Sequence, residues 1–270
     1  MEDVLVKPFS LRECREDFGG WEPTIDGDRV TVSAIAIDLA AAGYDLIITG
    51  RRENKLLDVK KQIAKEYDRL VFPLSFDIQD KEAVSDALNN LPESWSKINV
   101  LVNNAGLALG MSSFQQADIE DWDTMIDTNL KGLLYVSRLI SANMIAQRIE
   151  GQIINIGSTA GKEVYSNGNV YCASKHAVDA LNQGMRIDLN KYGIRVGAIN
   201  PGLVETEFSK VRFKGDDARA ETVYQGFQAL KAEDIADIIH FVVTRPYHVN
   251  IADLVVMPTA QASSTIINKE

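Results

Sequence analysis

Short apolar segments alternate with longer segments of helical periodicity from Ser33 to the end of the chain. The pattern predicts strands over residues 44–49, 70–76, 98–102, 152–156, 195–199 and 253–257. It predicts helices over residues 34–42, 53–67, 81–91, 119–148, 171–192 and 232–244. This regular alternation is typical of a parallel sheet with helices on both faces. In such sheets ligands bind beyond the carboxyl ends of the strands, so we expect the chemistry directly after each strand.

Composition narrows the class of protein further. The chain has 270 residues, of which 46% are hydrophobic, and this length allows one large α/β domain or two small ones, either with a substantial core. The chain has a net charge of −10, whereas a general nucleic-acid binder usually carries a basic surface. Two Cys and three His argue against a disulfide framework and an imidazole metal site. No apolar run reaches membrane-spanning length and the first residues do not resemble a secretion signal, so we expect a cytoplasmic protein.

Tyr171 and Lys175 lie four residues apart in a predicted helix, so their side chains share one face. An ammonium group beside a phenol favours the phenolate, and we therefore expect a lowered Tyr171 pKa and a general acid/base for an alcohol oxygen. In isolation this spacing more often belongs to a surface Tyr and a solvated Lys. Ser158 directly follows the predicted strand 152–156 and lies 13 residues before Tyr171. Its hydroxyl is a candidate donor to the same substrate oxygen.

Three further motifs lie where the pattern leads us to expect ligands. Asn129 falls inside a long predicted helix, where an amide competes for backbone hydrogen bonds. A surface polar residue or a local kink is the simpler interpretation of that position. The segments 103–106 (Asn-Asn-Ala-Gly) and 200–202 (Asn-Pro-Gly) each follow a predicted strand. Singly, each is a common loop.

Together, the order and spacing of these motifs resemble the short-chain dehydrogenase/reductase family from Ser33 to Glu270. The resemblance implies a single Rossmann-type domain over residues 33–270, a nicotinamide cofactor and a homotetramer. It implies a catalytic tetrad of Asn129, Ser158, Tyr171 and Lys175. The residues that it places at the cofactor are Asp77, Ile78, Asn104, Tyr171, Lys175, Pro201, Gly202, Val204 and Thr206.

Arg51 and Arg52 follow the predicted strand 44–49, where an NAD enzyme usually carries an acid for the adenosine ribose. Two guanidinium groups suit a 2′-phosphate instead, and they predict NADP as the cofactor. The alternative interpretation is a solvated basic turn.

Several segments resemble one branch of the family, the NADP-dependent 3-hydroxy acid dehydrogenases that also oxidise L-serine and L-allo-threonine. These segments are residues 101–110, 121–129, 201–209, 211–216 and the tail through Gln261. The substrate implied is a small hydroxy acid, or the corresponding semialdehyde in the reverse direction. Arg212 lies where a guanidinium could meet the substrate carboxylate, although a surface or subunit contact is an equal alternative. Another small alcohol or ketone is the alternative substrate.

Residues 1–32 depart from the family pattern. The family begins with a strand and a glycine-rich turn whose backbone approaches the cofactor pyrophosphate. Asp26, Val30 and Val32 occupy the positions where three glycines belong, and their side chains would block that approach. We therefore expect an atypical N-terminal segment. Either it stems from a different reading frame or start, or the chain is a non-catalytic Rossmann-like variant that lost cofactor binding.

Overall fold

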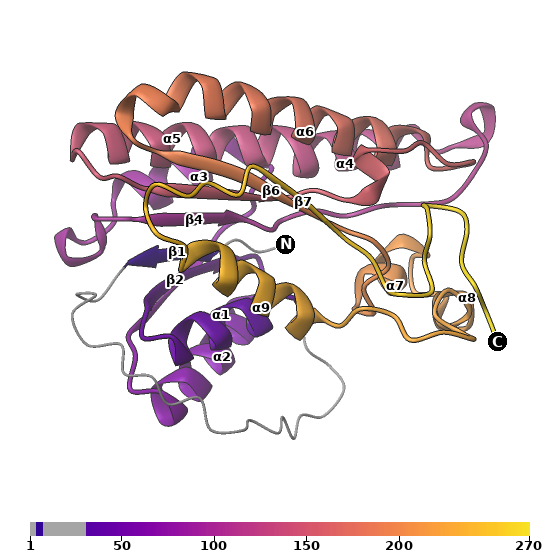
Figure 1. The fold of residues 1–270 in the computed structure, drawn as a ribbon, viewed down its shortest axis with the longest axis horizontal. Coiled ribbons are helices and arrows are strands. Elements are labelled where there is room, and N and C mark those ends of the chain that lie inside the picture. Colours follow the sequence, from indigo (N-terminus) through magenta and orange to yellow (C-terminus); the bar gives the residue numbers. More distant parts are fainter. Residues whose placement is uncertain (1–3, 8–30) are drawn as a thin grey trace.

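The computed structural model describes residues 4–7 and 31–270, which form one seven-stranded sheet in the order β3-β2-β1-β4-β5-β6-β7 (Figure 1). The strands are β1 (Val4–Lys7), β2 (Asp45–Gly50), β3 (Val71–Ser75), β4 (Val100–Asn103), β5 (Gln152–Ile156), β6 (Arg195–Pro201) and β7 (Asp253–Val256). All strand pairs that do not involve β1 are parallel. The strands from β2 onward match the predicted strands to within two residues at each end.

Helices cover both faces of the sheet (Figure 1). One face carries α1 (Thr31–Ala41), α2 (Glu53–Glu66) and α9 (Ala232–Val243), and the other carries α3 (Lys81–Asn89), α4 (Ile119–Ile126), α5 (Leu133–Ala146) and α6 (Asn169–Leu189). The predicted α/β fold, a doubly wound parallel sheet with helices on both faces, is confirmed. Two short helices that the pattern did not predict, α7 (Phe208–Arg212) and α8 (Asp217–Thr222), lie beyond β6.

Strand β1 is the exception in this sheet. It occupies the central position between β2 and β4 but runs antiparallel to both. Lys7 pairs with Asp45 at the amino end of β2, so the chain leaves β1 at the edge opposite the carboxyl ends. A strand that begins a Rossmann turn leaves at the carboxyl edge instead. The N-terminal strand is therefore atypical in its direction, and the sequence pattern did not predict it. Positions 26 and 30 of the missing glycine turn lie outside the described residues.

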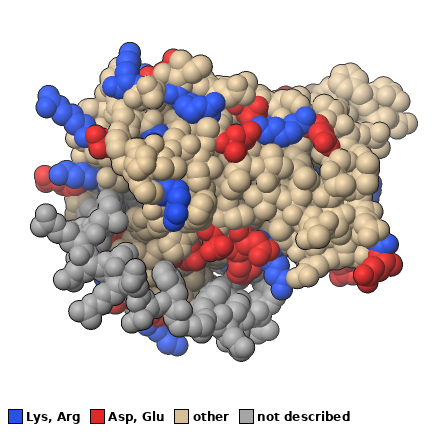
Figure 2. Space-filling model, in the orientation of Figure 1, with Lys and Arg blue, Asp and Glu red and all other residues tan. Residues whose placement is uncertain are grey.

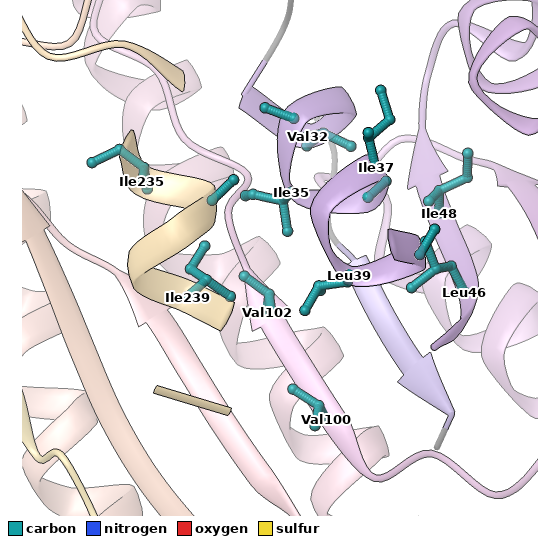
Figure 3. Close-up of a cluster of buried hydrophobic side chains, with 14 of the residues drawn as sticks. Val32, Ile35, Ile37, Leu39, Leu46, Ile48, Val100, Val102, Ile235 and Ile239 are labelled. Atoms are coloured by element: carbon teal, nitrogen blue, oxygen red, sulfur yellow. The ribbon is translucent and has the colours of Figure 1, made fainter. Parts of the chain in front are cut away.

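The largest of three hydrophobic clusters among the described residues lies between the sheet and helices α1, α2 and α9. Ile35 and Leu39 of α1 meet Ile239 of α9 above Val102 of β4 (Figure 3). All four side chains are buried, because these helices present apolar residues at helical spacing toward the sheet. The second cluster joins α3, α5 and α6 to the opposite face. The sheet is thus packed on both sides and forms a rigid base for the loops at its carboxyl edge.

A chain of buried amide side chains joins the central strands to α6. Asn103 donates through Nδ2 to Oδ1 of Asn155 at 2.8 Å, and Asn155 donates to Oδ1 of Asn182 at 3.0 Å. Asn182 in turn donates to the carbonyl of Ala252 at 3.1 Å. Buried amides are tolerated when they are paired in this way, and such networks fix one relative position of their elements. This network holds the ends of β4 and β5 in register with the helix that carries Tyr171.

Charged side chains are dispersed over the surface. On the face shown in Figure 2, described Lys and Arg side chains lie at several separate places, many of them beside Asp or Glu. Within residues 4–7 and 31–270, no helix is both long enough and apolar enough to span a lipid bilayer.

Candidate active site

A cavity of about 730 Å³ opens at the carboxyl edge of the sheet. Arg51 follows β2, Asn104 follows β4, Gly157 follows β5 and Pro201 ends β6, and all four line the cavity. Parallel strands bring their carboxyl ends to one edge, so segments far apart in the sequence meet there. The cavity thus opens directly after the strands, which is where the sequence pattern predicts the ligand site.

Ser158, Tyr171 and Lys175 line the same part of this cavity. Tyr171 and Lys175 project from one face of α6, and both are buried, with 8% and 5% of their surface exposed. Lys175 donates through Nζ to the carbonyl of Ile156 at 2.9 Å, which ties α6 to the end of β5. Gly157 allows this close packing of strand ends, because a Cβ there would overlap the Asn200 side chain. Neither Tyr171 nor Lys175 is therefore the solvated surface residue of the simpler interpretation.

The predicted lowering of the Tyr171 pKa is wrong in this structure. Burial raises the pKa of Tyr171 well above its ordinary 10.0, and a hydrogen bond with Ser158 and the charge of Arg212 offset only part of that rise. The Lys175 ammonium group donates its hydrogen bond to the backbone carbonyl of Ile156 and not to the Tyr171 phenol. Burial lowers the pKa of Lys175 itself, from 10.5 to about 8. In both side chains the cost of burying a charge is the largest cause.

Asn129 is buried, with 1% of its surface exposed, in a π-helical turn, η3 (Asp127–Gly132), between α4 and α5. Its side chain bonds both backbone groups of Leu107 at 2.8 Å and donates to Oγ of Ser174 at 3.0 Å. A Cβ on Gly106 would lie 3.2 Å from Nζ of Lys175 and 3.5 Å from Oδ1 of Asn129, so both contact the same glycine. The alternative of a surface polar residue is therefore excluded, and the irregularity of the helix at this position is a π-helical turn, a feature frequent at functional sites.

At the far end of the cavity, Arg51 and Arg52 are exposed and each faces a carboxylate. Arg51 lies 3.6 Å from Asp77, because β2 and β3 are parallel neighbours that end side by side. Arg52 lies 3.4 Å from Glu207, which precedes α7 on the other wall of the cavity. Among the described residues, Asp77 and Ile78 do not line the cavity; Ile78 is buried against Gly132.

The segment after β6 forms a further wall, to which Pro201, Gly202, Val204 and Thr206 contribute. The C-terminal tail holds it in place, since Oε1 of Gln261 accepts from the backbone N–H of Leu203 at 2.9 Å. A Cβ on Gly202 would overlap that same Oε1.

Arg212, the last residue of α7, extends from this wall toward Tyr171. Its guanidinium carbon lies 5.8 Å from the centre of the Tyr171 ring and 5.5 Å from that of Tyr165. Its Nε donates to the carbonyl of Gly110 at 3.3 Å. No described carboxylate lies within 4.0 Å of it. A cation that lines a cavity and faces only neutral groups is suited to bind an anion.

The family model described as short chain dehydrogenase matches residues 32–217. The chain belongs to the short-chain dehydrogenase family. It is 47% identical over 221 residues to the NADP-dependent 3-hydroxy acid dehydrogenase YdfG of Escherichia coli O6:H1, covering 82% of this chain and 87% of that protein.

Solved structures lead to the same family. The closed form of a serine dehydrogenase complexed with NADP⁺ superposes with a TM-score of 0.82 at 43% identity, covering 87% of this chain and 94% of that one. A serine dehydrogenase from Escherichia coli superposes with a TM-score of 0.74 at 37% identity, covering 87% and 95% of the two chains. This short-chain dehydrogenase is thus an oxidoreductase by family, as predicted, and the cofactor named for these relatives supports the predicted NADP.

The described cavity fits that cofactor. Two guanidinium groups, those of Arg51 and Arg52, line the cavity, as a phosphate requires, and so does the buried Lys175. Val32 is the described residue of the atypical segment that lines the cavity, at a position where the family has glycine. No group of His, Cys, Asp or Glu in the described part of this short-chain dehydrogenase could hold a metal ion.

Sequence reasoning missed several cavity residues of this short-chain dehydrogenase. Tyr165, Glu207, Phe208 and Gln261 all line the cavity. Tyr165 carried the clearest available signal, because a large aromatic side chain lies within a polar loop between Ser158 and Tyr171. Glu207 and Gln261 act through contacts with residues more than fifty positions away, and no sequence spacing reveals these.

Proposed function

We propose that this chain is an NADP-dependent oxidoreductase that interconverts the hydroxyl group of a small 3-hydroxy acid and the corresponding carbonyl. One observation carries the proposal: the Arg212 guanidinium lies 5.8 Å from the ring of Tyr171, within a cavity that Ser158 and Lys175 also line. A cation at that distance can hold an acid group while the phenol reaches an oxygen a few bonds away. The names of the relatives, 3-hydroxy acid dehydrogenase and serine dehydrogenase, support this substrate class.

Ser158, Tyr171 and Lys175 each have a different role in the proposed proton transfer. Tyr171 stays protonated at neutral pH because its pKa is raised, so it donates a proton to the carbonyl oxygen in the direction of reduction. The Ser158 hydroxyl donates a hydrogen bond to the same oxygen. Lys175, against Gly106 and next to Asn129, supplies positive charge that favours the phenolate left on Tyr171. Bound NADP(H) supplies the hydride chemistry.

The cofactor end of the site is assigned to the two arginines. Arg51 and Arg52 offer planar guanidinium groups to the 2′-phosphate, and Asp77 keeps Arg51 at the end of β2. Asn104 and the wall from Pro201 to Thr206 contact the nicotinamide half in this proposal, whereas the predicted contact of Ile78 is not retained, because Ile78 is buried outside the cavity. The cytoplasmic location and the homotetramer implied by the family stay predictions.

Replacing Glu207 by Gln should tighten NADPH binding. Glu207 pairs with Arg52 across the cavity at 3.4 Å and competes with the 2′-phosphate for that guanidinium. Both side chains are more than a third exposed, so the pair contributes at most about 1 kcal/mol, which corresponds to a roughly two- to five-fold lower Kd. Titration followed by NADPH fluorescence measures it. Glu205→Gln, a neighbouring exposed acid, is the control; an equal effect of both variants would show that only net charge matters.

Replacing Arg212 by Met should raise the KM for 3-hydroxypropionate about 10- to 100-fold, the worth of a hydrogen-bonded charge pair. The KM for a neutral alcohol of the same length should change little, because it has no acid group to lose. Steady-state kinetics with both substrates measure the difference. Arg219→Met is the matched control, since Arg219 is exposed on α8 and does not line the cavity. Equal effects on the acid and the alcohol would contradict the role of Arg212.

A specific observation favours a second candidate, a non-catalytic Rossmann-like protein. The reversed direction of β1 removes the usual strand-to-turn approach to the pyrophosphate. Incubation with NADP⁺ and 3-hydroxypropionate, followed by the absorbance of NADPH, separates the two candidates. Formation of NADPH supports the oxidoreductase. A folded protein that forms none with any small hydroxy acid or alcohol supports the non-catalytic candidate.

A further inference from the structure

Tyr165 is a cavity residue to which neither the family motifs nor the proton chemistry gives a role. It lies in the loop between β5 and α6 and is partly buried among Tyr171, Leu107 and Phe208. The guanidinium carbon of Arg212 lies 5.5 Å from the centre of its ring, and the charge of Arg212 offsets part of the rise that burial causes in the pKa of Tyr165. Arg212 therefore lies between two aromatic rings, those of Tyr165 and Tyr171.

The ring of Tyr165 is fixed to the start of the helix that carries Tyr171. Gly168 directly precedes α6, and a Cβ there would overlap the Tyr165 ring, coming within 2.7 Å of Cζ. The N–H of Gly168 donates to the carbonyl of Tyr165 at 3.1 Å, and the carbonyl of Gly168 accepts from the N–H of Cys172 at 2.8 Å. Tyr165 thus moves with α6, whereas Arg212 belongs to the separate short helix α7.

No described carboxylate forms an ion pair with Arg212. Tyr165, Tyr171, Cys172 and Tyr224 are among the titratable groups whose pKa its charge affects, and all four are neutral near pH 7. Its Nε donates to the carbonyl of Gly110, whose N–H bonds the Arg212 carbonyl in return at 2.9 Å. Cation–π contacts therefore orient the side chain without neutralising it.

We propose that Tyr165 is a positioning residue that holds the Arg212 guanidinium beside Tyr171, and so selects acidic over neutral substrates. The inference rests on the proposed function, because it assumes that Arg212 binds the acid group. Without Tyr165, the long Arg212 side chain regains rotamer freedom, and the acid group loses a pre-organised partner. Tyr165 also contributes to the raised pKa of Tyr171, but without that contribution Tyr171 still carries its proton near pH 7, because the ordinary pKa of the phenol is 10.0.

Two substitutions at Tyr165 separate the ring from the hydroxyl. Tyr165→Leu removes the cation–π contact with Arg212 and should lower kcat/KM for 3-hydroxypropionate about 3- to 30-fold through KM. Tyr165→Phe keeps the ring and should retain kcat/KM for this acid to within about two- to three-fold. For both variants, kcat/KM for a neutral alcohol of the same length should stay within about two-fold of the parent protein. The control variant Tyr192→Phe, at an exposed tyrosine, should show kcat/KM within about two-fold of the parent protein for the acid and for the alcohol. Equal losses for acid and alcohol would overturn the proposal, since they would indicate a merely structural role for the loop.

Gly168→Ala displaces the Tyr165 ring without changing the tyrosine itself. It should reduce the preference for the acid, and in combination with Tyr165→Leu it should add nothing further, because both act on one contact. Additive losses would contradict the proposal. Far-ultraviolet circular dichroism and NADPH titration identify a variant that does not fold, and the conservative Tyr165→Phe keeps the test open in that case.

The outcomes distinguish this inference from the proposed function. If the parent protein shows no preference for the acid, or if Arg212→Met leaves that preference intact, the proposed substrate class fails. If Arg212→Met abolishes the preference and Tyr165→Leu keeps it, only the role of Tyr165 fails. Competitive inhibition by propionate, an acid without a reacting hydroxyl, gives a second readout. Its inhibition constant should rise in Tyr165→Leu by the same factor as the KM for 3-hydroxypropionate.

Discussion

Tyr171→Phe should lower turnover by roughly 10²- to 10⁴-fold, the contribution of a positioned general acid or base. The change removes one oxygen from a buried ring that packs edge-on against Phe208 with 5.7 Å between ring centres, so the packing is retained. We therefore expect the loss in kcat, with NADPH binding and thermal stability close to those of the parent protein. Steady-state kinetics and thermal unfolding measure both effects.

The control for this experiment is Tyr192→Phe, which removes the same atom from an exposed tyrosine at the far end of the helical segment. It should leave kcat unchanged. If Tyr171→Phe retained more than about a tenth of the parent activity, the assignment of the proton to Tyr171 would be wrong.

Lys175→Met should abolish most of the activity and at the same time stabilise the fold at neutral pH. Burial lowers the Lys175 pKa from 10.5 to about 8, so the unfolded chain binds a proton more tightly than the folded one. Below pH 8 the folded state therefore carries a penalty of roughly 3 kcal/mol, which Met does not carry. Met also lacks the hydrogen bond that Lys175 donates to the Ile156 carbonyl, and this loss lowers the free energy of unfolding by about 1 kcal/mol. A net stabilisation of about 2 kcal/mol remains.

The pH dependence gives this prediction its sharpest test. As the pH rises from 7 toward 10, the unfolded chain also loses its proton and the penalty falls to roughly 1 kcal/mol. The parent protein should then approach the stability of Lys175→Met, as measured by urea unfolding at each pH. Lys191→Met, at an exposed lysine, should show no such convergence. A Lys175→Met variant that is less stable than the parent protein at pH 7 would show that the ammonium group stabilises the fold.

The alternating pattern predicted the α/β fold and most element bounds because strands and helices at the centre of a domain bury continuous apolar surfaces. Strand Gln152–Ile156 was predicted to the residue, since three of its five residues are isoleucine and the first four side chains are buried. The clustering of Ser158, Tyr171 and Lys175 was also predictable, because a parallel sheet brings strand ends together. The sequence also indicated an irregular helix at Asn129, because Asn is unfavourable within a helix, and the structure has a π-helical turn there.

Other features depend on contacts that no local pattern contains. Strand β1 has only four residues, and its antiparallel direction follows from the neighbours it pairs with. The ion pair between Arg52 and Glu207 joins residues 155 positions apart. The raised pKa of Tyr171 could not be predicted from the sequence either. The spacing shows that Lys175 is near Tyr171, but it does not show that Tyr171 is buried and that burial has the larger effect on its pKa.

Titration of the full chain with NADPH and, in parallel, with NADH tests the central claim most directly. We expect NADPH to bind at least about ten-fold more tightly, since two guanidinium groups face the 2′-phosphate that NADH lacks. The double variant Arg51→Ala/Arg52→Ala should bind both cofactors equally. Failure of the folded chain to bind either cofactor, or equal affinity for both, would contradict the account and leave the non-catalytic candidate.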